Sequence, residues 1–416
     1  MQFQKPLGAR DFYPEDTSPR ENVLSILKST CKRYGFSEVD CPDIENLSLL
    51  VAKSGEEIKT QIFNLEKKGD EELALRPEFT PTFARMFIER QKVLQKPVKW
   101  FTFGRCWRYE RPQKGRLREF FQLNAEIYGS DTALADAEVI SLAIECLVSL
   151  GLTKKDFKVK INSRELLESL LEGMGIKNSV DVFRVIDKKR KISSEAFVEE
   201  LGKAGLDNDK ISRLLTFLNL NDLNEFSSPL IKVATARNKL AQVFSYLEKL
   251  GKKDFIEFDL SVARGLAYYT GTVFECFDRD EKLRAVFAGG RYDKMIEQLG
   301  GQPCPAVGFA MGDVTLQLLL EQKKLWPKAD VGIEYFVAPM SEKQVPFALK
   351  VLSKVREKYT SDIDLMGRKL DKQLKFASSI GAAKVLIVGD DEVRTGKITV
   401  KDLQTGKQEK TSMDKI

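Results

Sequence analysis

The fold is decided by the stretch RYERPQKGRLREFFQ, residues 108–122, and by the alternating residues after it. A run rich in aromatic and β-branched residues, 99–108, enters this stretch, and a second run leaves it and extends to Ile127. Successive residues of a strand point to opposite sides, so the second run has one apolar face and one polar face. The polar face consists of Phe120, Gln122, Asn124 and Glu126. This pattern predicts a strand with a polar floor and one aromatic ring at its edge.

Arginines dominate the loop between the two predicted strands. The part from Arg108 to Arg118 also contains Lys114, and Pro112 and Gly115 interrupt it. A polar face by itself is most simply the solvated side of an antiparallel sheet. Guanidinium groups bind phosphate oxygens in pairs, however, so an arginine loop beside a polar floor favours a nucleotide site.

The chain contains no histidine among its 416 residues. This absence removes the commonest general base and the commonest metal ligand of enzymes. It excludes serine–histidine hydrolases and histidine-ligated metalloenzymes, and it leaves carboxylates, arginines, tyrosines or the substrate itself to carry the chemistry. The net charge of +6 suits a polyanionic partner but does not require one.

Length and composition predict two or three domains, with 43% hydrophobic and 31% charged residues. No apolar run approaches the roughly 18 residues of a membrane span, and residues 1–10 lack the apolar core of a signal peptide. We therefore expect no membrane partner and a cytoplasmic location. The six cysteines form no C-x-x-C pair, so we expect reduced core thiols and no metal held by cysteine or histidine.

A helix is predicted near the start of the chain. Ser18 can cap it, Pro19 suits the first helical position, and Glu21 can complete a capping box. Apolar residues then recur with helical spacing until Gly35, which stops the run.

The rest of the chain divides into segments with different predicted secondary structure. Short, charged helical segments occupy about 166–225, and strand character returns at 255–260, which predicts a helical insertion. A boundary follows near 323–330, where charge, a tryptophan and a proline interrupt the pattern. Strands and helices then alternate over 331–416, which predicts a small, mostly parallel α/β domain.

Two glycine-containing segments suggest that backbone approaches a ligand closely. The first, ARGLAYYTG at residues 263–271, holds two tyrosines and one arginine. Standing alone it would most simply be a turn between strands. The second is FAGGRYD at 287–293, where the glycines would let a helix end lie against a sheet or a ligand.

These segments resemble those of one family. Residues 108–122 closely resemble motif 2 of histidyl-tRNA synthetases, which are class II aminoacyl-tRNA synthetases. Residues 264–269 resemble their histidine-specific motif and 75–80 their substrate loop, in the same order along nearly the whole chain. The resemblance implies a class II antiparallel-sheet catalytic core over 1–325, including the helical insertion, and a C-terminal α/β anticodon-binding domain over 331–416.

The resemblance also implies how ATP would bind. Arg108 would bridge the α-phosphate and the carboxylate of the substrate histidine, and Arg116 would reach the outer phosphates. Glu110 would accept a hydrogen bond from the adenine amino group, while Phe120 would stack on the adenine ring. ATP accompanied by Mg²⁺ is the implied substrate. Gln113, in the same loop, is the residue assigned to the acceptor end of the tRNA.

The resemblance implies that the amino acid histidine binds through Glu78, Thr80, Gln122, Glu126, Tyr268 and Tyr269. The first three would hold the α-ammonium group. Glu126 and Tyr269 would bond the two imidazole nitrogens. Discrimination would arise there, because a substrate without these nitrogens would leave buried polar groups unpaired.

Catalysis is implied to depend on Arg264 and Arg108. Arg264 would be a fixed cation beside the α-phosphate, where it stabilises the charge that builds as the carboxylate oxygen attacks. Without a protein histidine, the base for transfer to tRNA would be an adenylate phosphate oxygen or a carboxylate such as Glu78. We favour the phosphate oxygen, because Glu78 would be occupied by the ammonium group of the substrate.

The chain departs from the family pattern at motif 3. Class II enzymes usually carry an arginine there that covers the second face of the adenine. The corresponding run is Gly312-Asp313-Val314-Thr315, so Thr315 stands in place of that arginine. Either another side chain such as Arg291 covers the adenine, or the chain binds ATP less tightly.

The function implied is ligation of histidine to the 3′ end of tRNA-His through a histidyl-adenylate, carried out by a homodimer. One alternative is the histidine-sensing regulatory subunit of ATP phosphoribosyltransferase. It generally resembles the catalytic core alone, so the C-terminal domain and the intact Arg108, Arg116 and Arg264 argue against it. The other alternative is an inactive, synthetase-like RNA-binding module, which the loss at Thr315 favours and the retained histidine contacts oppose.

Overall fold

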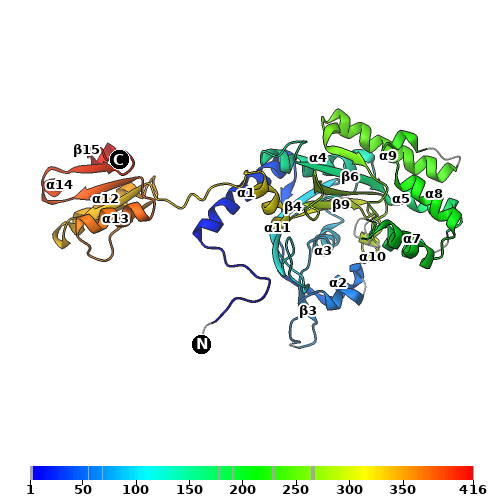
Figure 1. Cartoon of the computed structure of the whole chain (residues 1–416). Helices are drawn as coiled ribbons and strands as arrows, with labels where there is room; N and C mark the ends of the chain where they lie inside the picture. The colour runs from blue at the N-terminus through cyan, green and yellow to red at the C-terminus, as the bar shows by residue number, and fades with distance from the viewer. Residues whose placement is uncertain are drawn as a thin grey trace. The chain divides into compact units, whose positions relative to one another are not determined.

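The computed structural model of the chain describes residues 3–54, 56–67, 69–176, 179–189, 192–226, 230–263 and 268–415. The chain forms two compact units (Figure 1), of which one joins Met1–Asp11 with Asn22–Pro327 and the other joins Phe12–Glu21 with Lys328–Ile416. Each unit is built on a sheet of its own.

In the described residues, the first unit contains an eight-stranded sheet with the order β1-β4-β5-β10-β9-β8-β6-β7. Its strands are β1 (Ser37–Glu38), β4 (Val98–Trp107), β5 (Glu119–Tyr128), β6 (Phe157–Ser163), β7 (Ile256–Phe258), β8 (Thr272–Asp278), β9 (Phe287–Arg291) and β10 (Ala306–Gly312). The six strands from β4 to β6 in this order pair antiparallel, whereas β1 with β4 and β6 with β7 pair parallel. The mostly antiparallel core predicted for this part of the chain is confirmed.

The central pair β4–β5 positions the motif 2 loop. The register runs from Val98 opposite Tyr128 to Trp107 opposite Glu119, so the loop of residues 108–118 emerges at one end of the pair. The apolar face of β5 enters the core as predicted. Its polar face is buried as well, because almost every residue of the strand from 121 onward is shielded from solvent. The predicted polar floor is therefore an internal surface.

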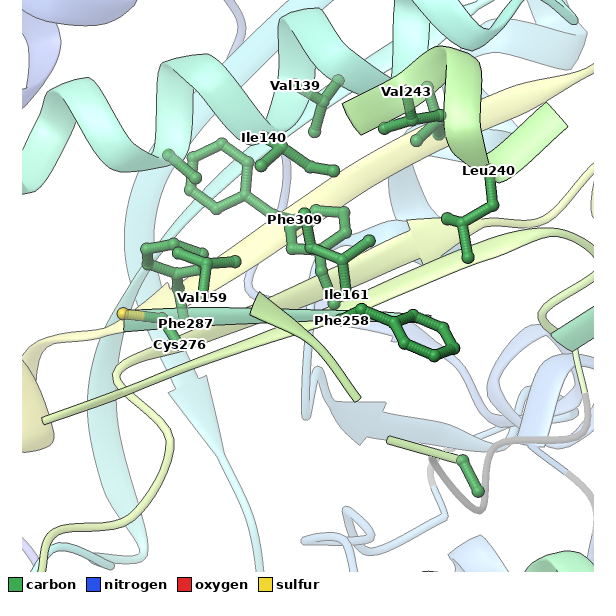
Figure 2. Packing of buried hydrophobic residues seen from close by; sticks show 14 of the residues in the cluster. Val139, Ile140, Val159, Ile161, Leu240, Val243, Phe258, Cys276, Phe287 and Phe309 are labelled. Atoms are coloured by element: carbon green, nitrogen blue, oxygen red, sulfur yellow. The ribbon is translucent and has the colours of Figure 1, made fainter. Parts of the chain in front are cut away.

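Helices α4 (Ala133–Ser149) and α9 (Ile231–Lys249) cover the apolar face of the sheet. The α4 helix starts after Thr132, whose side chain accepts a hydrogen bond from the N–H of Ala135. Figure 2 shows Val139 and Ile140 of α4, with Leu240 of α9, directed toward side chains from the strands. These side chains are almost fully buried, and they belong to one hydrophobic cluster that includes residues of the strands β5, β6, β7, β8, β9 and β10. The main hydrophobic cluster therefore lies between the sheet and these two helices, and the polar side chains of β5 lie on the opposite face.

Between β6 and β7 the described chain is helical. The helices are α5 (Arg164–Gly173), α6 (Ser179–Ile186), α7 (Ser194–Lys203), α8 (Asn208–Leu218) and α9. This run of helices continues to Lys249, beyond the 166–225 expected for the insertion. Among the described helices, none has the length and apolar character needed to cross a membrane.

The first helix begins earlier than predicted. The structure places α1 at Pro14–Arg33, so Pro19 lies inside it. Ser18 does not cap the helix, because its Oγ donates to the carbonyl of Asp330 at 3.0 Å. Proline pre-sets a helical backbone angle wherever its missing N–H is tolerated, and Pro14 at the first position meets this condition better than Pro19.

The second unit has a five-stranded sheet with the order β12-β11-β13-β14-β15 in the described residues. Its elements are β11 (Tyr335–Pro339), α12 (Val345–Val355), β12 (Ser361–Ile363), α13 (Leu370–Ser379), β13 (Lys384–Val388), α14 (Asp390–Thr395), β14 (Lys397–Asp402) and β15 (Gln408–Ser412). The first three strands pair parallel and the last two add as an antiparallel hairpin. The α/β alternation predicted from the sequence is confirmed.

Candidate active site

The motif 2 loop is closed by its own backbone. The N–H of Arg108 donates to the carbonyl of Arg118 at 2.8 Å, and Gln113 and Arg116 exchange two further bonds at 3.0 and 2.8 Å. Gly115 turns the chain with a φ of +77°, a conformation that favours glycine. Gln113 is exposed at the tip of this turn.

A cavity of about 710 Å³ opens beside this loop, over the polar face of the sheet. This size is within the range of small-molecule sites. Its lining includes the four residues assigned to ATP, together with Gln122 and Thr315. The side chains assigned to ATP are Arg108, Glu110, Arg116 and Phe120.

Both motif 2 arginines that line the cavity have partners within the protein. Arg108 lies over the ring of Phe120, with Cζ 5.2 Å from the ring centre, and its Nε donates to the carbonyl of Pro77 at 3.1 Å. Arg116 forms an ion pair with Glu110. The two residues assigned to the adenine amino group and the outer phosphates therefore neutralise each other, and a nucleotide would have to separate them.

A buried carboxylate stands at the other end of the polar floor. Glu126 accepts hydrogen bonds from Thr80 Oγ1 at 2.7 Å, from Asn124 Nδ2 at 3.0 Å and from the hydroxyl of Tyr128. Gln122 joins this network by donating to Asn124 Oδ1 at 2.5 Å. Burial raises the pKa of Glu126, and these hydrogen bonds oppose the increase.

Glycines make the space around this carboxylate. Gly308 in β10 lies directly opposite Glu126, and a Cβ atom there would be 2.6 Å from Glu126 Cγ. Gly290 in β9 adjoins Tyr269, whose ring would lie 2.8 Å from a Cβ at that position. Contacts this short exclude any side chain, so the two glycines allow Glu126 and Tyr269 to approach the strands.

Lys53 completes the site, although no sequence motif surrounds it. It extends from α2 (Leu47–Ser54), its side chain is fully buried, and its Nζ lies 2.5 Å from Glu78 Oε1. The same ammonium lies 4.1 Å from the ring centre of Tyr268. Burial lowers the pKa of Lys53, whereas Glu78 raises it. The charge of Arg108 also lowers the pKa of Lys53 and that of Glu126 raises it, so Lys53 interacts with residues assigned to ATP and to histidine.

Arg291 does not cover the cavity. Its Nε and Nη2 contact Asp136 Oδ1 at 2.8 and 2.6 Å, and its Nη1 contacts Asp293 Oδ1 at 3.0 Å. Two backbone carbonyls, of Ser130 and Thr132, accept further bonds. The side chain is 7% exposed and is absent from the lining of the cavity. The expectation that Arg291 covers the adenine is therefore wrong, because a buried carboxylate holds this arginine elsewhere.

Most residues assigned from the sequence lie together along one face of β5. The ATP set lines the cavity, while the histidine set adjoins the network around Glu126 or contacts Lys53. Arg264, the expected catalytic cation, lies outside the described residues. The described part of the chain contains no group of three or more acidic or cysteine side chains that could hold a metal ion.

Sequence reasoning missed Lys53 and Arg284, of which the second lines the cavity from the loop between β8 and β9. Each is a single basic residue without a surrounding motif, so neither carried a signal. Tyr128 and Tyr292 beside Glu126 were missed for the same reason.

Family models and curated relatives match nearly the whole chain. The family model for histidyl-tRNA synthetase matches residues 8–315, and that for an anticodon binding domain matches 334–416. The histidine–tRNA ligase of Haloarcula marismortui is 38% identical over 96% of this chain and 94% of its own length. That of Pyrococcus horikoshii is 38% identical over 100% and 97%.

A solved structure gives the same result in three dimensions. The crystal structure of histidyl-tRNA synthetase from Nostoc sp. PCC 7120 superposes with a TM-score of 0.84 at 25% identity, covering 100% of this chain and 98% of that one. The sequence, the fold and the order of the motifs along the chain thus point to the same group of enzymes. The chain belongs to the histidyl-tRNA synthetase family, the ligases that join histidine to tRNA.

Proposed function

We propose that the described site makes histidyl-adenylate from histidine and ATP and transfers the histidyl group to tRNA-His. One observation carries this assignment. A single face of β5 leads from a cavity with arginines to a buried carboxylate with no ion-pair partner among the described residues. The first feature suits a triphosphate and the second suits an imidazole N–H.

ATP would enter the cavity as its Mg²⁺ complex. Phe120 would stack on the adenine and Arg108 would contact the α-phosphate. Glu110 would exchange its present partner, Arg116, for the adenine amino group. Arg116 would then be free to bind the outer phosphates, so that binding of the nucleotide replaces one ion pair with two charge-assisted contacts.

Histidine would occupy the volume between Glu78 and Glu126. Its α-ammonium group would bind Glu78, Thr80 and Gln122, and its imidazole would bind Glu126 and Tyr269. Tyr268 would form a wall of this volume beside Tyr269, since the two ring centres are 4.5 Å apart. A substrate without ring nitrogens would leave Glu126 desolvated, which provides selectivity of a size that hydrophobic contacts alone do not reach.

The first reaction would be an in-line displacement. A carboxylate oxygen of histidine attacks the α-phosphorus of ATP, the bond to the bridging oxygen of the β-phosphate breaks, and pyrophosphate leaves. Arg108 would stabilise both reacting groups, and Arg264 would serve as the second cation beside the α-phosphate. In the second reaction the ribose hydroxyl of the tRNA attacks the carbonyl carbon, and AMP leaves with the proton on a phosphate oxygen.

The second unit would supply the anticodon contacts, and Gln113 at the loop tip would face the acceptor end. We also propose that the enzyme works as a homodimer in the cytoplasm. All six cysteines are free thiols, which suits a reducing compartment.

Histidine-dependent exchange of pyrophosphate into ATP tests the proposal. We expect exchange with histidine and with no other standard amino acid. A folded protein that gives no exchange with histidine would rule out the activity. A protein that exchanges but does not charge tRNA would retain the site and lose the proposed acceptor.

A further inference from the structure

The loop between β8 and β9, residues 279–286, brings a guanidinium into the ATP cavity. Arg284, Ala285 and Val286 of this loop line the cavity together with Arg116 and Thr315. The motif 3 arginine is missing at Thr315, and the structure has already excluded Arg291 as its substitute. Arg284 is the remaining arginine in the described lining apart from the two in motif 2.

Arg284 lies next to the position where the arginine is missing. A Cβ atom built on Gly115 would be 3.4 Å from Arg284 Cδ and 3.8 Å from Thr315 Oγ1. Both side chains therefore contact the same small volume beside the turn of motif 2. An extended guanidinium anchored there can reach into a space that the short threonine leaves open.

Two of the three charged side chains that act on the pKa of Arg284 are positive. No carboxylate among the described residues is in ion-pair contact with it. Partial burial lowers its pKa, and the positive charges of Arg116 and Arg108 lower it further, opposed by Glu110. The carboxylate that acts on Arg284, Glu110, itself pairs with Arg116, whereas Asp187, Glu275 and Glu281 line the cavity without a contribution to the pKa of Arg284. Like charges at close quarters are destabilising unless a ligand compensates them, and a polyphosphate would do so.

We propose that Arg284 binds the outer phosphates of ATP together with Arg116 and so adds a cation to a cavity that lacks the motif 3 arginine. This inference rests on the proposed use of the cavity for ATP. It assigns Arg284 to the phosphates and not to the adenine face, because Arg284 lies beside Gly115, the residue before Arg116, and Phe120 already offers a ring to the base.

The test compares ligands with and without outer phosphates. Arg284→Ala should raise the KM for ATP and for pyrophosphate in the exchange reaction by about tenfold or more, as expected when a charge-assisted contact is lost. The dissociation constant of a sulfamoyl analogue of histidyl-adenylate, which lacks those phosphates, should change less than about twofold. Arg284→Lys keeps the charge without the planar fork and should give an intermediate KM for ATP.

Arg279→Ala is the matched control, because Arg279 lies in the same loop, pairs with Glu257 and does not line the cavity. It should leave all three constants unchanged, and thermal unfolding should show both alanine variants folded. An unchanged KM for ATP in active Arg284→Ala enzyme would overturn the inference. Equal weakening of ATP and of the adenylate analogue would also overturn it, since Arg284 would then act on the adenosine part. Absence of exchange in the unsubstituted protein would instead refute the proposed function.

Discussion

The ammonium of Lys53 forms an ion pair with the carboxylate of Glu78, the group expected to bind the α-ammonium of histidine. The two atoms are 2.5 Å apart, and the Lys53 side chain has no solvent exposure. A buried lysine normally requires a paired carboxylate, because desolvation of an isolated ammonium is costly. Lys53 therefore neutralises Glu78, and a histidine ammonium that binds Glu78 as proposed would have to displace it.

Lys53→Met should lower the KM for histidine about threefold to tenfold, because the substrate would no longer compete with an internal ammonium for Glu78. Steady-state exchange at varied histidine would measure it. Lys252→Met serves as the control, because Lys252 pairs with Glu145 outside the site. A higher KM in Lys53→Met would contradict displacement and show that Lys53 instead orients Glu78.

Glu126→Gln should raise the KM for histidine by about 100-fold, because the amide cannot accept the imidazole N–H as a carboxylate does. The same substitution should alter the pH dependence of stability. Burial raises the pKa of Glu126 above its usual 4.5, so the folded protein holds this proton more tightly than the unfolded chain does. The stabilisation from this protonated carboxyl is complete at pH values below the pKa of Glu126 in the unfolded chain. It is lost as pH rises through the raised pKa of the folded protein.

The unfolding temperature of the unsubstituted protein minus that of Glu126→Gln should therefore decrease as pH increases from about 4.5 to neutrality. Calorimetry of both proteins over this range would measure the difference. A difference that grows with pH would mean that the hydrogen bonds from Thr80, Asn124 and Tyr128 outweigh burial.

Gly308→Ala should weaken histidine binding and lower the free energy of unfolding by about 1–3 kcal/mol, because the added methyl would overlap Glu126 Cγ. Gly312→Ala on the same strand is the control, since nothing lies within 4 Å of a Cβ there. Chemical denaturation and the KM for histidine would be compared for both. Equal behaviour of the two variants would show that β10 moves aside freely.

Arg291→Ala should act on stability and not on ATP. Its removal would leave Asp136 buried with Thr272 as a remaining hydrogen-bond donor, at a cost of about 3–5 kcal/mol in the free energy of unfolding. The exposed pair Arg279–Glu257 provides the comparison, and its loss should cost less than about 1 kcal/mol. A specific increase in the KM for ATP in folded Arg291→Ala would restore this arginine as an adenine contact.

Ending the chain after Lys328 should leave exchange of pyrophosphate largely intact and strongly reduce charging of tRNA. The cavity and the network around Glu126 consist of residues from the first unit, whereas the second unit has its own sheet and core. Parallel assays of exchange and charging on one preparation would measure the split. Proportional loss of both would show that the second unit supports the core.

The sequence determined the parts of the site that lie within one strand or one turn. Alternation along β5 placed Gln122, Asn124 and Glu126 on one face, because side chains of a strand have a fixed period of two. The arginine loop followed from local composition, and Gly115 from the need to turn. The α/β alternation of the second unit was readable because its strands and helices differ in period.

Tertiary structure decided which distant residues meet those parts. Pro14 and not Ser18 begins the first helix, since Ser18 bonds to Asp330, 312 residues away. Arg291 was a candidate for ATP in the sequence, and Asp136, 155 residues before it, holds it in the interior.

Lys53 and Arg284 carry no motif, so their roles depend wholly on where packing brings α2 and the β8–β9 loop. A single charged residue has the same local sequence signature whether it is solvated, buried or facing a ligand. Its surroundings consist of residues far away along the chain, and the sequence alone does not specify which of them will be within a few ångströms. Local sequence therefore determines the periodicity of strands and helices, whereas the tertiary fold determines which residues surround an isolated charged side chain.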